Sequence, residues 1–283
     1  ISYLSCIIHR MEDIAALIKR TASGEPPVIS LRSVKELAGS GGLSQLEIEK
    51  TALASGVIPE RYERNIGTLG IEGQAKLLDA CMGICGLGGL GGHIVELLAR
   101  YGAGHLILVD GDVFNENNLN RQILCTEADL GRAKAGVAAE RAAAINSSIR
   151  VTTHQVYIDP DNVASVFGEA QVVIDALDSV SCRLDLEEGC RQIGIPLVHG
   201  AIAGHCGQVM TVFPGDPGLE CIYIEGEDRG VETSEGNPPT TPALVAALQV
   251  QEAVKIMCGG ELLRHGFLLL DTATNLYQFI SLR

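Results

Sequence analysis

The stretch Gly86-Leu-Gly-Gly-Leu-Gly-Gly92 follows a short apolar segment and precedes a helical pattern. Glycine permits a tight turn and lets backbone amides approach a phosphate, while a helix N-terminus adds partial positive charge. Gly86, Gly88 and Gly91 fit the spacing G-x-G-x-x-G, with Gly89 between the last two. The stretch predicts a nucleotide-binding turn between a strand and a helix, without indicating which nucleotide.

Strand patterns alternate with helical patterns on the C-terminal side of this turn. The expected strands cover residues 81–85, 105–109, 151–156, 172–174, 196–199 and 209–213, with a closing hairpin over 267–270 and 277–282. The expected helices cover residues 91–101, 130–145, 161–167, 181–193 and 243–257. Such alternation predicts an α/β fold with a Rossmann-like, doubly wound, mostly parallel sheet and a β-rich C-terminal section.

Residues 1–60 show a different pattern. Apolar residues recur at helical spacing over 7–17 and again over 43–54, and Gly24-Glu-Pro-Pro27 interrupts them. We expect an N-terminal helical extension over 1–60, serving as a packing or dimerisation arm, followed by one domain over 61–283.

Composition narrows the class of protein. A net charge of −14 and an aromatic content of 4% argue against nucleic-acid binding. No apolar run is long enough to span a bilayer, so we expect no membrane insertion. Nine irregularly spaced cysteines indicate reduced thiols in a cytoplasmic protein, and we expect Cys125 and Cys206 to be buried core thiols.

Polar residues follow the second strand of the predicted sheet, at the edge where such sheets bind ligands. Asp110 lies 19 residues beyond Gly91, a position that accepts hydrogen bonds from a ribose in NAD and ATP sites alike. Asp112, Asn118 and Arg121 come next. A hydride-transfer enzyme has no need of this Arg and Asn, whereas the charge of a triphosphate must be neutralised. The segment therefore favours ATP.

At this point the motifs, in order, resemble the ThiF/MoeB/HesA family, the bacterial relatives of ubiquitin-activating enzymes. The glycine turn is followed by D-x-D at 110–112 and by N-L-x-R-Q at 118–122. Arg61-Tyr-Glu-Arg-Asn65 is similar to the family's R-Y-x-R-Q, with Asn where Gln is usual. The resemblance extends from about residue 61 to the C-terminus, so the domain over 61–283 is identified as a ThiF-type adenylation domain.

Two further blocks carry the resemblance. Leu130-Gly-Arg-Ala-Lys134 matches G-x-x-K, and Asp175-Ala-Leu-Asp-Ser179 matches D-x-x-D-N with Ser179 in place of Asn. The resemblance implies that Lys134 binds phosphate and that Asp178 holds Mg²⁺. Taken alone, Asp178 could also be the N-cap of the helix that begins nearby.

The resemblance also implies a reaction and a set of roles. A substrate carboxylate attacks the α-phosphate of ATP, which gives an acyl-adenylate and pyrophosphate. The leaving phosphates are held by cations, the ribose by an aspartate, and two further polar residues complete the pocket. The residues implied are, for phosphate, Arg64 from the neighbouring subunit of a homodimer, Arg121 and Lys134; for ribose, Asp110; and for the rest of the pocket, Asp112 and Asn118.

Two departures from the family pattern concern cysteine. Many relatives hold zinc with two C-x-x-C pairs, but Cys221 lacks its partner and the second pair is absent, so we predict no zinc. Relatives that transfer the acyl group to sulfur use a cysteine before the last long helix. Here Glu232, Thr233 or Ser234 occupies that position, so a catalytic-cysteine thioester is not expected.

The predicted function is that of an adenylyltransferase using ATP and Mg²⁺. Its expected substrate and partner is the C-terminal Gly of a small ubiquitin-like sulfur-carrier protein, as in thiamine or molybdopterin synthesis. Three alternatives stay open at this point: adenylation of a peptide or small-metabolite carboxylate, an NAD-binding Rossmann protein, and a nucleotide-binding scaffold without turnover.

Overall fold

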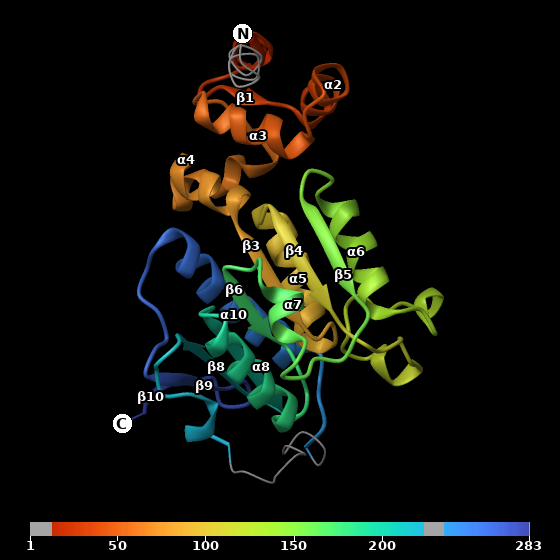
Figure 1. The fold of residues 1–283 in the computed structure, drawn as a ribbon, viewed down its shortest axis with the longest axis vertical. Helices are drawn as coiled ribbons and strands as arrows, with labels where there is room; N and C mark the ends of the chain where they lie inside the picture. The colour runs from red at the N-terminus through yellow and green to blue at the C-terminus, as the bar shows by residue number, and fades with distance from the viewer. Residues whose placement is uncertain (1–12, 224–234, 283) are drawn as a thin grey trace.

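The structure, a computed structural model, describes residues 13–223 and 235–282 (Figure 1). Its centre is an eight-stranded sheet of order β10-β9-β8-β7-β6-β3-β4-β5. The strands run over Cys81–Cys85 (β3), His105–Val109 (β4), Arg150–His154 (β5), Val172–Asp175 (β6), Leu197–Ala203 (β7), Cys206–Val212 (β8), Gly266–Asp271 (β9) and Leu276–Ser281 (β10). The first five pair in parallel, and β7 to β10 pair antiparallel. The predicted mostly parallel sheet and its closing hairpin are confirmed.

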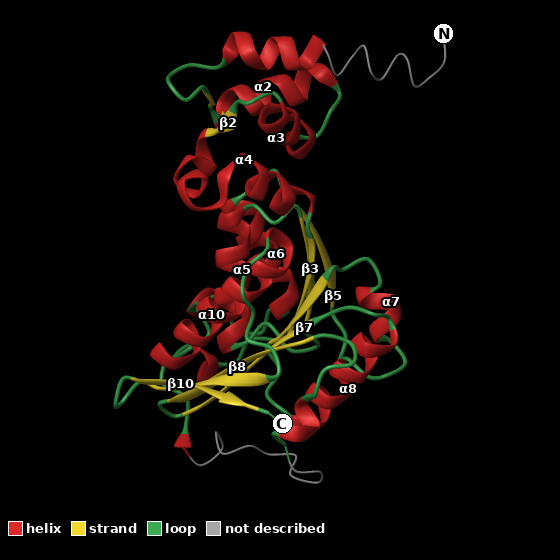
Figure 2. Cartoon of the chain, turned by 90° about the vertical axis from the view of Figure 1, so that its left-hand side faces the viewer, coloured by secondary structure: helices red, strands yellow, loops and turns green. Residues whose placement is uncertain are grey.

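Helices cover both faces of this sheet, as Figure 2 shows. On one face lie Gly89–Tyr101 (α5), Lys134–Ile145 (α6) and Thr240–Cys258 (α10); on the other lie Val163–Phe167 (α7) and Val180–Gln192 (α8). Each face is sealed by its own apolar cluster of strand and helix residues. Burial on both faces is the reason why β3, β4 and β6 read as apolar runs in the sequence, whereas the edge strand β5 is only partly buried.

The start of one helix departs from its prediction by a full turn. The helix expected from residue 130 begins at Lys134, four residues later. Before it, Glu127–Asp129 forms a short 3₁₀ turn, and Gly131 has a φ of 82°, which no α-helix accommodates. Hydrogen bonds from Thr126 and Arg132 to the Asp129 carboxylate hold this turn in place.

The N-terminal part forms a small unit at one end of the molecule, at the top of Figure 1. It contains a helix at 13–21, Leu31–Gly41 (α2) and Gln45–Ala54 (α3), with Val28–Ile29 (β1) paired in parallel to Ile58–Pro59 (β2). The helical character over 43–54 matches α3, whereas α2 and the small strand pair were not predicted. Glu60–Tyr62 (η1) and Glu63–Asp79 (α4), which turns sharply at Gly70, lead into the sheet.

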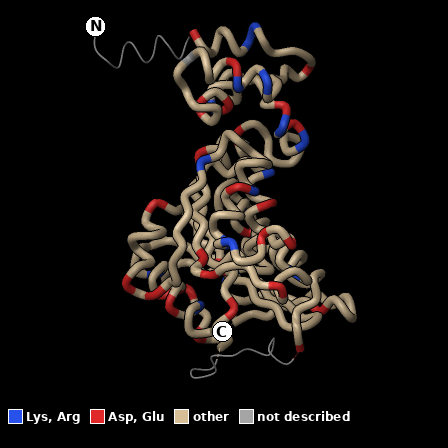
Figure 3. The backbone as a smooth tube through the Cα atoms, turned by 90° about the vertical axis from the view of Figure 1, so that its right-hand side faces the viewer, with Lys and Arg blue, Asp and Glu red and all other residues tan. Residues whose placement is uncertain are grey.

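The distribution of charged residues along the backbone agrees with the acidic composition of the sequence. Figure 3 shows acidic positions along the whole tube, with basic positions interspersed. Within residues 13–223 and 235–282, none of the helices combines the length and apolarity that a bilayer span requires.

Candidate active site

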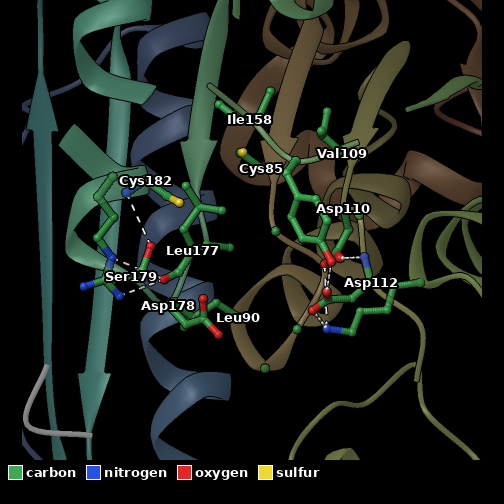
Figure 4. A pocket seen from close by; sticks show the side chains of 18 of the residues that line it. Cys85, Leu90, Val109, Asp110, Asp112, Ile158, Leu177, Asp178, Ser179 and Cys182 are labelled. Atoms are coloured by element: carbon green, nitrogen blue, oxygen red, sulfur yellow. Dashed lines mark hydrogen bonds and ion pairs between the residues drawn. The ribbon is translucent and has the colours of Figure 1, made fainter. Parts of the chain in front are cut away.

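A cleft of about 560 Å³ opens at the carboxyl ends of β3, β4 and β6. This is the edge at which open α/β sheets bind ligands, and the volume lies within the usual range of ligand pockets. In Figure 4, Leu177, Asp178 and Ser179 gather on one side and Asp110 and Asp112 on the other.

The glycine turn forms the floor of this cleft. Gly86 adopts a φ of 90°, and its N–H donates to the Val109 carbonyl at 2.8 Å. A Cβ on Gly91 would overlap the Gly86 carbonyl oxygen, so this glycine lets the helix pack against the turn. Gly86, Gly88 and Gly89 line the cleft, whereas Gly91 lies behind them. Among the predicted glycines, three can therefore approach a ligand and one has a packing role.

Asp110 stands at the end of β4 and lines the cleft. One carboxylate oxygen accepts the Leu87 N–H at 2.7 Å, and the other accepts the Asp112 N–H at 2.8 Å. Each oxygen keeps a further lone pair for an incoming hydroxyl. Asp110 thus ties the glycine turn to the next loop and can still accept a ribose.

Lys134 and Asp112 form an ion pair on the same wall. The Lys134 ammonium donates to Asp112 at 2.9 Å and lies 4.0 Å from Asp110, and its side chain is only 8% exposed. Tyr157, although 71% exposed, donates its hydroxyl proton to Asp112 at 2.8 Å. Partial burial would raise the pKa of Asp112, but the hydrogen bonds from Lys134 and Tyr157 outweigh it and hold that pKa below its usual value.

Arg121 and Gln122 close another part of the cleft. The Arg121 guanidinium donates to the Asn117 carbonyl and to the Asn120 side chain, both at 2.9 Å. Gln122 is 5% exposed, and its side-chain oxygen has no partner within the described residues. Asn237, which also lines the cleft, has an unpaired side-chain oxygen in the same sense. Buried amide oxygens of this kind are ready to accept hydrogen bonds from a ligand.

Asp178 is exposed in the cleft directly after β6. Within residues 13–223 and 235–282, no hydrogen bond or ion pair engages its carboxylate. The N-cap alternative is wrong, because Ser179 is the N-cap of α8 and accepts the Cys182 N–H with its hydroxyl. A free carboxylate oxygen is the ligand type that Mg²⁺ prefers, so the site fits the ion.

Two predicted site residues are not brought to the cleft of this chain. Arg64 is exposed on α4 and does not line it. Asn118 is buried, accepts the Asn115 N–H at 3.0 Å and donates to Asn117 at 3.1 Å. The amide of Asn118 therefore closes the 3₁₀ turn Glu116–Asn118 (η2) instead of facing a ligand.

Of the two cysteines predicted to be buried, one is buried and one is exposed. Cys125 is buried as expected, but Cys206 is exposed, because it begins β8 at the sheet end next to a turn. Cys221 is exposed, and the described residues contain no group of three side chains able to hold a metal. Glu232, Thr233 and Ser234 lie outside the described residues. The absence of zinc and of a thioester stays a prediction.

Tyr157, Asn237 and Arg183 also line the cleft but were not predicted as site residues. The only signal for Arg183 was its place on the helix that follows Asp178. Gln122 was visible beside Arg121 in its motif but was given no role. Tyr157 and Asn237 come from loops that lie far from the motifs in the chain, so no local pattern pointed to them.

Comparison with known proteins gives a consistent picture. A model of the ThiF family matches residues 62–283. The SAMP-activating enzyme E1 of Haloferax volcanii is 34% identical over 230 residues, which are 79% of this chain and 85% of that protein. The sulfur carrier protein ThiS adenylyltransferase of Escherichia coli is 31% identical over 229 residues, 79% of this chain and 91% of that protein.

Other relatives are longer. The adenylyltransferase and sulfurtransferase MOCS3-1 of Zea mays is 32% identical over 262 residues, and the chain spans 55% of its length. Among solved structures, E. coli MccB with ATP superimposes with a TM-score of 0.69 and 25% identity, over 79% of this chain and 72% of MccB. The predicted Rossmann-like α/β fold is thereby confirmed.

Proposed function

Since the chain belongs to the ThiF family, we propose that it is an adenylyltransferase that uses ATP and Mg²⁺ to activate a carboxylate. The proposed substrate is the C-terminal Gly of a small ubiquitin-like sulfur carrier. The observation that carries this proposal is the pairing of an unengaged carboxylate, Asp178, with the cations Arg121 and Lys134 around one glycine turn. That combination serves a triphosphate with its metal, and a hydride-transfer site has no use for it.

The reaction asks the protein for position and charge rather than for covalent chemistry. A substrate carboxylate oxygen forms a bond to the α-phosphorus, and the bond from that phosphorus to the bridging oxygen breaks. Pyrophosphate leaves with the electron pair, so no proton transfer is needed. When bound at Asp178, Mg²⁺ would neutralise phosphate charge. Lys134 and Arg121 bind the leaving phosphates, Asp110 binds the ribose, and Gly88 and Gly89, which line the cleft, would let the backbone approach the phosphates.

The assembly belongs to the same proposal. A homodimer would bring Arg64 of one subunit to the cleft of the other, which is consistent with its exposed place outside its own cleft. The proposed reaction includes no thioester to a cysteine of the enzyme, because adenylation ends at the acyl-adenylate.

Exchange of labelled pyrophosphate into ATP tests this function. We expect exchange with a Gly-Gly-ended carrier such as ThiS, and its loss in Asp178→Ala. Glu188→Ala, which removes an exposed carboxylate from the nearby helix α8, should exchange at the wild-type rate. If exchange occurs only with another peptide or with a small acid, the substrate is a carboxylate of that class instead. Tight NAD binding without ATP binding, or ATP binding without exchange, would refute the proposal.

A further inference from the structure

A cluster of buried and partly buried polar side chains lies next to the backbone that carries Asp178. It consists of Asp175, Arg183, His199, Gln208 and Tyr223, and we call it the Asp175 cluster. Asp175 and His199 are fully buried, and Arg183 is 5% exposed. Burying so many polar groups is costly unless each is paired, so their arrangement calls for a structural or functional reason.

The cluster holds the backbone that carries Asp178. Asp175 accepts the Leu177 N–H at 2.9 Å with one oxygen. Arg183 donates to the Leu177 carbonyl twice, through Nε at 3.2 Å and Nη2 at 2.7 Å. This carbonyl belongs to the peptide unit that joins Leu177 to Asp178. Both polar groups of Leu177 are thus held from the protein interior.

The holding groups are themselves anchored to three other elements. The second oxygen of Asp175 accepts Nδ1–H of His199 on β7 at 2.6 Å. Nε2 of His199 then lies 3.1 Å from the Tyr223 hydroxyl, which also accepts from Arg183 at 3.1 Å. Gln249 on α10 donates to the Asp175 carbonyl at 2.7 Å. Burial lowers the pKa of His199 despite Asp175, which keeps the ring neutral with one donor and one acceptor nitrogen.

The Asp178 carboxylate is left out of this arrangement. Arg183 lies 3.9 Å from Asp175 and compensates its charge, while within the described residues Asp178 has no polar partner. The contacts therefore fix where the Asp178 peptide lies and leave its carboxylate free for a ligand. Mg²⁺ demands near-ideal octahedral geometry, whereas Ca²⁺ tolerates flexible coordination.

We propose that Arg183, supported by Asp175 and His199, is a positioning residue that sets Asp178 for Mg²⁺ by clamping the Leu177–Asp178 peptide. The inference rests on the proposed function, because it assumes that Asp178 holds the metal. Loss of the clamp weakens Mg²⁺ binding more than Ca²⁺ binding, since only Mg²⁺ requires an accurately placed ligand.

Calorimetric titration of Mg²⁺ and Ca²⁺ into the full chain with the non-hydrolysable analogue AMPCPP tests the clamp without turnover. In Arg183→Lys, which keeps the charge but loses the two-pronged donor, we expect the Mg²⁺ Kd to rise about tenfold, while the Ca²⁺ Kd rises less than about threefold. The control is Arg191→Lys on the same helix, whose ion pairs with Glu187 and Glu188 lie outside the cluster; both constants should stay at wild-type values.

If Arg183→Lys does not fold, a milder variant can take its place in the test. Tyr223→Phe removes one hydroxyl from the cluster and should shift the Mg²⁺ constant in the same direction by about threefold. Thermal unfolding identifies which variants are folded. An unchanged ratio of the two metal constants in folded Arg183→Lys, or in Tyr223→Phe if the former does not fold, overturns the clamp. Asp178→Asn separates the two ideas: weaker binding of both metals supports the metal assignment on its own, and unchanged binding refutes the assignment and the clamp together.

Discussion

In the proposed reaction, Lys134 exchanges its partner Asp112 for phosphate when ATP binds. In the structure its ammonium is paired with Asp112 and lies within reach of Asp110, while Tyr157 holds Asp112 from the other side. A triphosphate would offer more negative charge than one half-exposed carboxylate. The Tyr157 hydroxyl would still donate to Asp112 in that state, so the Asp112 carboxylate would keep one hydrogen bond after Lys134 moves to the phosphates.

Lys134→Met should therefore reduce pyrophosphate exchange by about a hundredfold, because one preorganised charge is lost at the leaving group. Stability should change little, since Asp112 is half exposed and keeps the Tyr157 hydroxyl. Exchange kinetics and thermal unfolding measure the two effects. Lys76→Met, on the surface of α4, serves as the matched control and should exchange normally. A loss smaller than about threefold would remove Lys134 from the phosphate site.

The role of Asn118 could not be predicted from its position in the motif. Its place in N-L-x-R-Q predicted a pocket residue, yet its amide caps a 3₁₀ turn. Asn side chains hydrogen-bond readily to nearby backbone, and this local choice depends on the conformation of the loop. Arg121, three residues later, does face the cleft, as expected.

The turn between β3 and α5 combines glycines that approach the cleft with one that packs the helix. Its glycines have different tasks, which the spacing alone could not separate. Gly91 allows helix and turn to touch, whereas a Cβ on Gly89 would meet Pro242 at 3.5 Å and Arg121 at 3.8 Å, both ordinary contact distances.

Gly91→Ala should destabilise the fold by about 3 kcal/mol, because its methyl group would overlap the Gly86 carbonyl and force the helix away from the strand. Gly89→Ala should change the free energy of unfolding by less than about 0.5 kcal/mol. Urea unfolding of both variants measures the difference. Equal stabilities would contradict the packing role of Gly91.

The boundaries of elements were harder to predict than their existence. Seven of the eight strands of the large sheet were expected within one residue of their observed starts, and β8 was expected three residues late. β7 extends four residues beyond its expected end. Helix α2 was not predicted, although Val34, Leu37 and Ala38 recur at helical spacing; the Ser30 cap and contacts with α3 stabilise it.

For the whole molecule, the N-terminal unit is joined to the sheet by a buried polar contact. Glu49 of α3 accepts hydrogen bonds from Ser148 at 2.9 Å and Tyr62 at 3.1 Å, and Arg61 lies 3.4 Å away. Burial raises the pKa of Glu49 above its usual value, although Arg61 opposes the rise. A buried carboxylate of this kind binds a proton more readily in the folded protein than in the unfolded one.

The sign of the pH dependence follows from that difference. As pH falls from neutral through the folded-state pKa toward 4.5, the folded protein takes up a proton first, so Glu49 contributes increasing stability. Glu49→Gln removes this titration. We expect the wild type to gain stability relative to the variant as pH falls, measured by urea unfolding at several pH values. A difference between wild type and Glu49→Gln that stays constant with pH would contradict the raised pKa.

Mixing of variant subunits tests the proposed homodimer. Arg64→Ala and Asp178→Ala should each be inactive, but mixed subunits should recover about a quarter of wild-type exchange. About half of randomly mixed dimers are heterodimers, and each has one intact site of two. Purified wild-type dimers taken through the same mixing procedure give the reference. Recovery no greater than the parent variants would mean that each site is complete within one chain.

The sheet, the position of the glycine turn and the meeting of distant motifs could be predicted from the amino-acid sequence alone. Strands buried on both faces leave an unmistakable apolar run, and parallel strands necessarily bring their carboxyl ends to one edge. Residues just after β3, β4 and β6 therefore had to converge. Only the tertiary structure decided which side chains at that edge face the cleft. Asn118 turned to its own backbone, Gln122, Tyr157 and Asn237 lined the cleft, and Arg183 clamped the Asp178 peptide, because these orientations depend on contacts between segments far apart in the chain.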